Sequence, residues 1–258
     1  MILADNPRGK RHLALSLRLF QNTSGEAMHG IDGGSAPLRA HVTERANFGR
    51  LSVMHPTFYS FRRCPYAMRA RLALVASKCR VELREVVLRE KPAAFLAASP
   101  SATVPCLVTE EMVLDESLDI MVWALQQQDP DGWLQMPNAG WSWIARADGP
   151  FKRALDRTKY ATRYPDTDPE AQRALAGEFL ADLDVQIETW IFDGPTLADF
   201  AILPFVRQFA FIDKARFDEQ PWPALQAWLE RFLTSETFGA IMQKYPQWSR
   251  NDAPIFFP

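Results

Sequence analysis

The sequence predicts a two-part fold in which an α/β unit is followed by an all-helical unit. Three observations support this prediction. Short β-prone runs alternate with helical runs over residues 54–128. A polar stretch rich in turn formers follows, and we take 129–137 as a linker. From 138 to about 250 the apolar periodicity is helical throughout. An α/β unit of this size buries one central sheet between helices.

The first unit begins with a short aromatic, β-prone run at 57–61, and Pro65 is well placed to begin the next helix. Met68, Leu72 and Val75 then recur at helical spacing and give that helix an apolar stripe. The remaining elements are expected to be a strand at 81–88, a short helix at 92–98, two hairpin strands at 104–109 and 112–114, and a helix at 117–128.

In the second unit, Asp168 followed by Pro169 and Glu170 is typical of a helix start. Apolar residues then recur about every four positions through the segment 175–187. Seven of the eight tryptophans lie beyond residue 128. We interpret most of them as core or interdomain packing, because large aromatic side chains usually carry that role.

The two ends of the chain differ from these units. Residues 1–53 hold six of the twelve glycines and no tryptophan, so they cannot bury much apolar surface. We expect a poorly ordered extension there, with Met28 and Met54 as alternative starts; a small regulatory arm is the alternative. Residues 251–258 are expected to form a tail.

Composition excludes several classes of partner. The net charge is −2 and there are no long Lys/Arg blocks, so nothing favours nucleic acid or an anionic membrane. The apolar run Leu13–Phe20 is too short to span a bilayer and is interrupted by Arg18. The three cysteines are odd in number and widely spaced, which suits free thiols in a reducing compartment. We therefore expect a cytoplasmic protein.

Cys64 is the strongest candidate for chemistry. It lies between the first strand and the helix that Pro65 begins, where backbone N–H groups and the helix dipole favour a thiolate. Arg62, Arg63 and Arg69 add positive charge nearby in sequence. These features predict an ionised, nucleophilic sulfur; the alternative is a buried, inert cysteine.

Three further segments could serve a ligand. Val104-Pro105 at the entrance to a strand is a candidate cis peptide, which would turn the backbone groups of Val104 outward for strand-like pairing; an edge-strand proline without function is the alternative. Glu116 and Ser117 begin a helix and could hold an amino-acid head group, although a well-capped helix explains them equally well. Lys91, after the second strand, is by itself an ordinary surface lysine.

Together these segments resemble the glutathione transferase superfamily, and within it the omega-class and omega-like bacterial members. The resemblance covers about residues 55–250. Its motifs stand in family order and at close to family spacing, and they are Cys64-Pro65-Tyr66-Ala67, Lys91-Pro92, Val104-Pro105 and Glu116-Ser117.

The resemblance implies a thioredoxin-like N-terminal domain with a mixed four-stranded sheet and three helices, an all-α C-terminal domain, and usually a homodimer. It implies that Cys64 is the catalytic thiol and that glutathione, as co-substrate, is bound by the set Lys91, Val104, Pro105, Glu116 and Ser117. It also implies that Thr196 and Asp199 form a capping box with a folding role. The chain departs from the family in its N-terminal extension and in Cys106, where an aliphatic residue is usual.

Cys106 is interpreted as a small apolar substitute, with a second redox thiol as the alternative. Ala67 stands where a dithiol motif has its second cysteine, so Cys64 has no local resolving partner. The predicted intermediate is therefore a mixed disulfide with glutathione, in a glutathione-dependent thiol transferase. This exchange needs no metal, and the four histidines all precede Cys64 without metal-ligand spacing.

The acceptor pocket is expected between the domains. Phe61 and Tyr66 beside the thiol, with Trp141, Phe151 and Tyr160 from the second domain, could line it; plain packing is the alternative for each. Two rival functions remain open. One is S-conjugation of electrophiles, for which the hydroxyl groups of Tyr59, Ser60 or Tyr66 could act near the glutathione sulfur. The other is a binding or regulatory protein without turnover.

Overall fold

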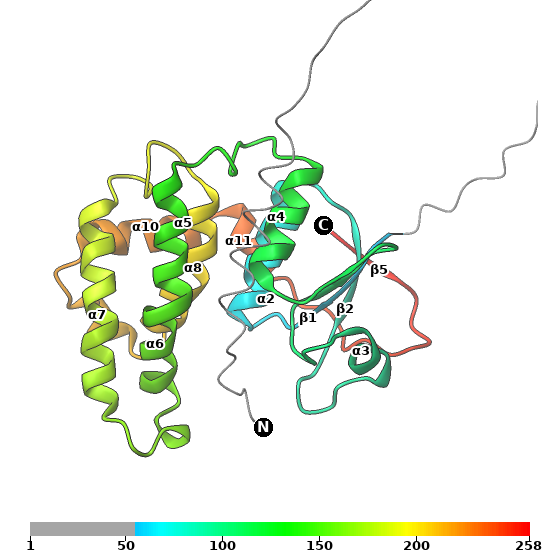
Figure 1. The fold of residues 1–258 in the computed structure, drawn as a ribbon, viewed down its shortest axis with the longest axis horizontal. Coiled ribbons are helices and arrows are strands. Elements are labelled where there is room, and N and C mark those ends of the chain that lie inside the picture. The colour runs from blue at the N-terminus through cyan, green and yellow to red at the C-terminus, as the bar shows by residue number, and fades with distance from the viewer. Residues whose placement is uncertain (1–54) are drawn as a thin grey trace, which may run out of the picture. The chain divides into compact units, whose positions relative to one another are not determined.

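A computed structural model describes residues 55–258 of the chain. The predicted extension at 1–53 lies outside the described residues. Over 55–258 the chain forms a sheet with three flanking helices, followed by a helical part (Figure 1). The two-part fold predicted from the alternation of elements is thus confirmed.

One mixed sheet organises the first part. Its strand order is β4-β3-β1-β2-β5. The neighbours β1 and β2 run parallel, and the other three pairs are antiparallel. The strands are β1 (Thr57–Ser60), β2 (Val81–Glu85), β3 (Cys106–Val108), β4 (Val113–Leu114) and β5 (Ile255–Phe257).

The C-terminal segment corrects the prediction of a four-stranded sheet and a tail at 251–258. Ile255, Phe256 and Phe257 pair with β2 as a fifth, antiparallel strand. The physical reason is that β2 would otherwise be an edge with unpaired backbone groups, and Phe257 fills the core there with only 2% of its surface exposed.

Helices cover both faces of the sheet, as Figure 1 shows for α2, α3 and α4. Strand alternation sets the two faces: Phe58 and its partner Leu107 belong to the main hydrophobic core, whereas Tyr59 and its partner Cys106 belong to a smaller cluster with Phe95 of α3. The helices of the first part are α2 (Pro65–Ala76), α3 (Ala93–Ala98) and α4 (Ser117–Gln127).

The second part is helical, as predicted. Its helices are α5 (Asn138–Arg146), α6 (Lys152–Lys159), α7 (Pro169–Gln186), α8 (Leu197–Ala210), α9 (Lys214–Asp218), α10 (Pro223–Leu233) and α11 (Glu236–Ile241). A π-helical turn at Ala147–Phe151 joins α5 to α6, and Pro150 lies within it. Asp168 accepts a hydrogen bond from Glu170 N at 2.9 Å and so caps α7 at the predicted position.

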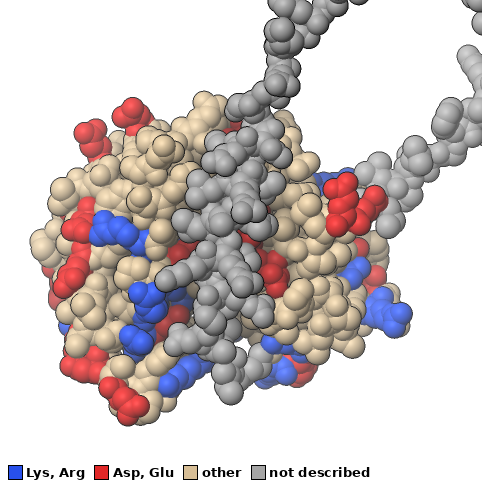
Figure 2. All heavy atoms as spheres, in the orientation of Figure 1, with Lys and Arg blue, Asp and Glu red and all other residues tan. Residues whose placement is uncertain are grey.

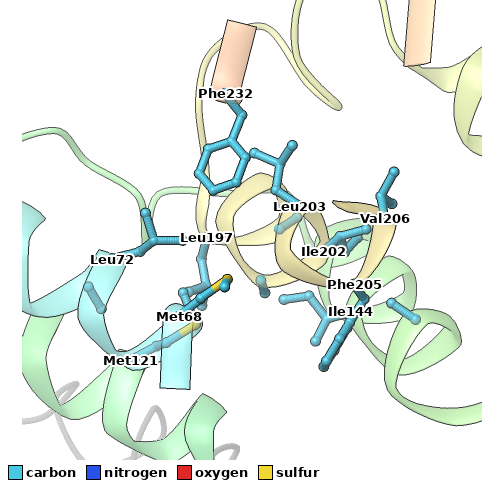
Figure 3. Packing of buried hydrophobic residues seen from close by; sticks show 14 of the residues in the cluster. Met68, Leu72, Met121, Ile144, Leu197, Ile202, Leu203, Phe205, Val206 and Phe232 are labelled. Carbon is cyan, nitrogen blue, oxygen red and sulfur yellow. The ribbon is translucent and has the colours of Figure 1, made fainter. Parts of the chain in front are cut away.

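One continuous apolar core joins the two parts. Met68 and Leu72 of α2 meet Leu197 at the start of α8, as Figure 3 shows. Arg69 lies within this packing with 1% of its surface exposed. Its Nε donates to the carbonyl of Ala201, and its guanidinium pairs with Asp148. The helical part thereby fixes the position of α2 and of the residue that begins it.

The start of α8 is the most polar point of this core. Thr196 and Asp199 form a capping box there. Asp199 is fully buried, and its carboxylate accepts hydrogen bonds from Ile191 N and from Trp228 Nε1, each at 3.0 Å. Burial raises the pKa of this carboxyl group.

The surface carries charges of both signs. On the face drawn in Figure 2, Lys and Arg side chains are interspersed with Asp and Glu side chains over the described residues. Among the helices of residues 55–258, none combines the length and apolar character needed to cross a bilayer.

Candidate active site

Cys64 occupies the junction between β1 and α2. It is the N-cap residue of α2, in extended backbone conformation, and Pro65 is the first residue of the helix. Its backbone N–H donates to the carbonyl of Phe61 at 2.9 Å, which closes a tight turn after β1. Its sulfur lies 3.7 Å from the carbonyl oxygen of Val104, within reach of an S–H donor.

Burial has the largest effect on the Cys64 thiol and raises its pKa above the ordinary value. Four groups act in the opposite direction. The backbone N–H groups of Ala67 and Tyr66 point at the sulfur, as expected at a helix N-terminus, and Lys152 and Arg71 contribute positive charge. Because burial outweighs them, the prediction of a sulfur ionised in the unliganded protein was wrong.

The arginines chosen from sequence are not among the charges with the largest effect on the sulfur. Arg69 is buried against α8, and Arg63 is exposed and stacks over the ring of Phe61 at 5.4 Å. Arg62 directs its guanidinium toward the Met242 carbonyl at 3.5 Å. Residues that are close to Cys64 in the sequence can therefore direct their side chains away from its sulfur.

Lys152 is the functional candidate that sequence reasoning missed. Only 7% of its surface is exposed, its ammonium pairs with Asp156, and it lies 5.4 Å from the ring centre of Tyr66. The sequence gives little signal for this burial, because Lys152 directly follows Phe151 and so falls outside the apolar face that Phe151, Ala154 and Leu155 define.

The Val104–Pro105 peptide bond is cis. Val104 has 7% of its surface exposed and enters β3 beside the sulfur of Cys64. Two contacts hold the loop that precedes it: Lys91 Nζ donates to the Ala102 carbonyl at 2.7 Å, and Ser101 N–H donates to Asp115 at 3.0 Å. The loop after β2, the loop before β3 and the start of α4 therefore converge.

Glu116 and Ser117 begin α4, as the sequence indicates. Glu116 is the N-cap residue in extended conformation and is partly exposed, whereas Ser117 is the first helical residue and is 4% exposed. Because Asp115 binds the loop that leads into Val104, the predicted glutathione residues are brought to one end of the sheet with Cys64.

The five residues proposed for an acceptor pocket separate into two groups. Phe61 packs in the smaller cluster with Cys64, Tyr66 lies at the start of α2, and Tyr160 lies close enough to Cys64 for ionised sulfur to raise the pKa of its hydroxyl. Phe151, in contrast, is 1% exposed and stacks on a core phenylalanine, so its role is packing. Trp141 is partly buried against the same core.

The hydroxyl groups of Tyr59 and Ser60 and the thiol of Cys106 are less suited than Cys64 to react with a ligand. The Tyr59 hydroxyl accepts a hydrogen bond from Arg84 at 2.8 Å, and the Ser60 hydroxyl accepts one from Arg71 at 2.9 Å; both residues are buried. Cys106 is fully buried, and burial with the nearby Asp115 charge raises its pKa to about 11. This environment favours the interpretation of Cys106 as a small apolar residue.

Among residues 55–258, no group of three or more His, Cys, Asp or Glu side chains is arranged to hold a metal ion. All three cysteines are free thiols.

Comparison with known proteins places this arrangement in a family. Residues 58–132 match the glutathione S-transferase N-terminal domain, and residues 142–231 match the glutathione S-transferase C-terminal domain. The two matches together cover more than half of the chain, which therefore belongs to the glutathione S-transferase family.

A relative and two solved structures extend this result. Mouse glutathione S-transferase omega-1 is 35% identical over 103 residues, a match that spans 37% of this chain and only 39% of the mouse protein. A glutathione transferase family member from Pseudomonas fluorescens, solved with two glutathione bound, has a TM-score of 0.63 at 18% identity, over 75% of this chain and 94% of that one. Glutathione transferase Omega 3C from Trametes versicolor has a TM-score of 0.63 at 18% identity, over 73% and 84%. These structures share the fold.

Proposed function

We propose that the protein is a glutathione-dependent thiol transferase in which Cys64 forms a mixed disulfide with glutathione. The observation that carries the proposal is the position of the Cys64 sulfur, at a helix N-terminus and 3.7 Å from the Val104 carbonyl beside a cis proline. The mouse omega-1 relative and the bacterial structure with two glutathione bound support the use of glutathione, which is the coarser part of this proposal.

Glutathione would pair with Val104 as an added strand, through its cysteinyl N–H and C=O groups. Lys91 would bind the glycine carboxylate. Its ammonium has three protons and uses one on the Ala102 carbonyl, so two remain to donate. The start of α4 would hold the γ-glutamyl end of glutathione. Glu116 would bind the ammonium of the ligand, and Ser117 with the helix N–H groups would bind its carboxylate.

This pairing offers a way to activate the thiol. In the unliganded protein the Val104 carbonyl is an acceptor within reach of the S–H group, and burial favours the protonated sulfur. A glutathione N–H that donates to Val104 takes that acceptor away from the thiol. The N–H groups of Tyr66 and Ala67 and the charge of Lys152 then favour the thiolate against the effect of burial alone.

The exchange follows in two steps. The Cys64 thiolate attacks the glutathione sulfur of a glutathionylated acceptor, the acceptor disulfide breaks, and the acceptor leaves as a thiolate that takes up a proton. A second glutathione thiolate attacks the Cys64–glutathione disulfide and forms oxidised glutathione, and Cys64 regains its electron pair. Overall the acceptor is reduced from a disulfide to a thiol and one free glutathione is consumed; the oxidised glutathione contains it together with the glutathione taken from the acceptor. Phe61, Tyr66 and Tyr160 are the residues we propose to face the acceptor.

Intact-mass measurement after exposure to oxidised glutathione tests the proposal. Wild-type protein and the Cys106→Ser variant are each expected to gain one glutathione, and Cys64→Ser to gain none. An internal Cys64–Cys106 disulfide, or an adduct that persists in Cys64→Ser, contradicts the mechanism. Thiol transfer is also expected to vanish in Cys64→Ser; glutathione conjugation that persists in this variant would identify an S-conjugating enzyme instead.

A further inference from the structure

Glu85, the last residue of β2, connects three segments around the Cys64 loop, which we define as residues 61–64. Its Oε1 accepts a hydrogen bond from the backbone N–H of Arg62 at 2.6 Å, and its Oε2 accepts one from the Arg71 guanidinium. Its backbone carbonyl accepts one from Trp248 N–H at 2.8 Å. The Glu85 side chain is 11% exposed.

Arg71 continues this network inside the protein. It lies on α2 with no exposed side-chain surface, and it donates from Nε to the Ser60 hydroxyl and from Nη1 to the Ile241 carbonyl, each at 2.9 Å. Ser60 immediately precedes the Cys64 loop, and Arg62 lies within it. The Arg71–Glu85 pair therefore holds the chain on both sides of Phe61, whose carbonyl receives the N–H of Cys64.

A carboxylate is the group that this position requires. Its two oxygens satisfy two different donors, whereas an amide offers only one acceptor and would present an N–H to the other donor. The bonds are also charge-assisted and largely shielded from water, which makes them stronger than average hydrogen bonds.

We propose that Glu85 is a positioning residue for Cys64: through the Arg62 N–H and through Arg71, it holds the loop that keeps the sulfur against the Val104 carbonyl. The catalytic purpose of this position rests on the thiol-transferase function proposed above. The positioning itself does not depend on that function, because it concerns only the conformation of the loop and the place of the sulfur.

The test measures how fast each cysteine of the intact protein reacts with iodoacetamide, followed by peptide mass spectrometry. In Glu85→Ala the Cys64 loop loses its anchor, the sulfur becomes more exposed, and Cys64 is expected to react about tenfold faster. This is the factor by which the loss of one hydrogen bond to a charged group shifts a local opening equilibrium. Glu85→Gln keeps one acceptor and should give a smaller increase.

Two controls separate positioning from general destabilisation. Glu82→Ala removes a carboxylate of the same strand that pairs with Arg84 and does not contact the Cys64 loop, so the Cys64 rate should stay at the wild-type value. Global opening is read from urea unfolding of each variant, because Cys106, although fully buried, packs in the same small cluster as Phe61 and Cys64. An unchanged Cys64 rate in Glu85→Ala, or a rise that the loss of unfolding free energy alone accounts for, overturns the proposal.

A second readout links the position to the chemistry. The mixed disulfide of Cys64 with oxidised glutathione should form more slowly in Glu85→Ala, because the freed sulfur is no longer held beside the Val104 backbone where glutathione would bind, although the iodoacetamide reaction becomes faster. Opposite changes in the two rates support positioning, and a parallel increase overturns it. If wild-type protein forms no adduct, the proposed function fails, while the iodoacetamide comparison still decides the role of Glu85.

Discussion

The sulfur of Cys64 lies 3.7 Å from the carbonyl oxygen of Val104. This contact joins the N-cap of α2 to the residue two positions before β3. This contact and burial favour the protonated thiol in the absence of a ligand. The same carbonyl is the group that a strand-like ligand would occupy. We therefore expect the acidity of Cys64 to depend on whether a ligand occupies the Val104 carbonyl.

The pH dependence of Cys64 alkylation should show this coupling. An ordinary cysteine has a pKa of about 8.5. Because burial raises the pKa of Cys64, its reaction with iodoacetamide in the unliganded protein should still accelerate above that pH. S-methylglutathione, which cannot form a disulfide, should move the midpoint to lower pH. The site-resolved rate is read by peptide mass spectrometry. A plateau below pH 8 in the unliganded protein would contradict the raised pKa.

The thiol also affects stability with a definite sign. The unfolded thiol titrates at about 8.5 and the folded one higher, so the folded state holds its proton longer. Its contribution to the free energy of unfolding is present below the unfolded pKa and is lost as pH rises toward the folded pKa. Cys64→Ser removes this component, which a urea titration at several pH values can detect.

Lys152→Met should slow the reaction of Cys64 severalfold at pH 8. The buried ammonium of Lys152 lowers the pKa of the thiol, and methionine keeps much of the apolar stem without the charge. Lys214→Met is the matched control, because Lys214 forms the same i,i+4 pair, with Asp218, on an exposed surface. Equal Cys64 rates in Lys152→Met and wild type would exclude an electrostatic role for Lys152.

Much of this arrangement was predictable because it depends on local rules. Pro65 after a β-prone run fixes the start of α2, and Asp168 before Pro169 fixes the start of α7. The position of Cys64 at the helix N-terminus follows from such signals. Its pKa does not, since the cluster that buries the sulfur collects residues from segments far apart in the sequence, such as Phe61, Val104 and Trp248.

The fifth strand and the Glu85 network were not predictable for the same reason. Nothing in the short run Ile255–Phe257 indicates which strand it pairs with, and the nearest edge is chosen by the whole fold. Likewise, in the sequence Glu85 is only a polar residue near the end of a predicted strand, with no sign of its partners. Only the fold brings the N–H of Arg62 and the guanidinium of Arg71 to its two oxygens.

Asp199→Asn should lower the free energy of unfolding by about 2–4 kcal/mol without a direct effect on Cys64 chemistry. The buried carboxylate accepts hydrogen bonds at both oxygens, and an amide would leave donors on one side unsatisfied, at about 1–3 kcal/mol for each buried group. Urea unfolding of the variant gives the value. The exposed Asp193→Asn serves as a control, and a similar loss in both variants would argue against the capping role.

Two adjacent phenylalanines of β5 give the sharpest test of the fifth strand. Phe257 is 2% exposed and packs in the core opposite Val81, so Phe257→Ala should destabilise the protein by about 3–5 kcal/mol. Phe256 points to the other face, is 39% exposed and lies over Arg80, so Phe256→Ala should cost about 0.5 kcal/mol. Urea unfolding curves of both variants decide the matter. If the segment were a loose tail, the two substitutions would have equally small effects; the alternation of a strand requires that they differ.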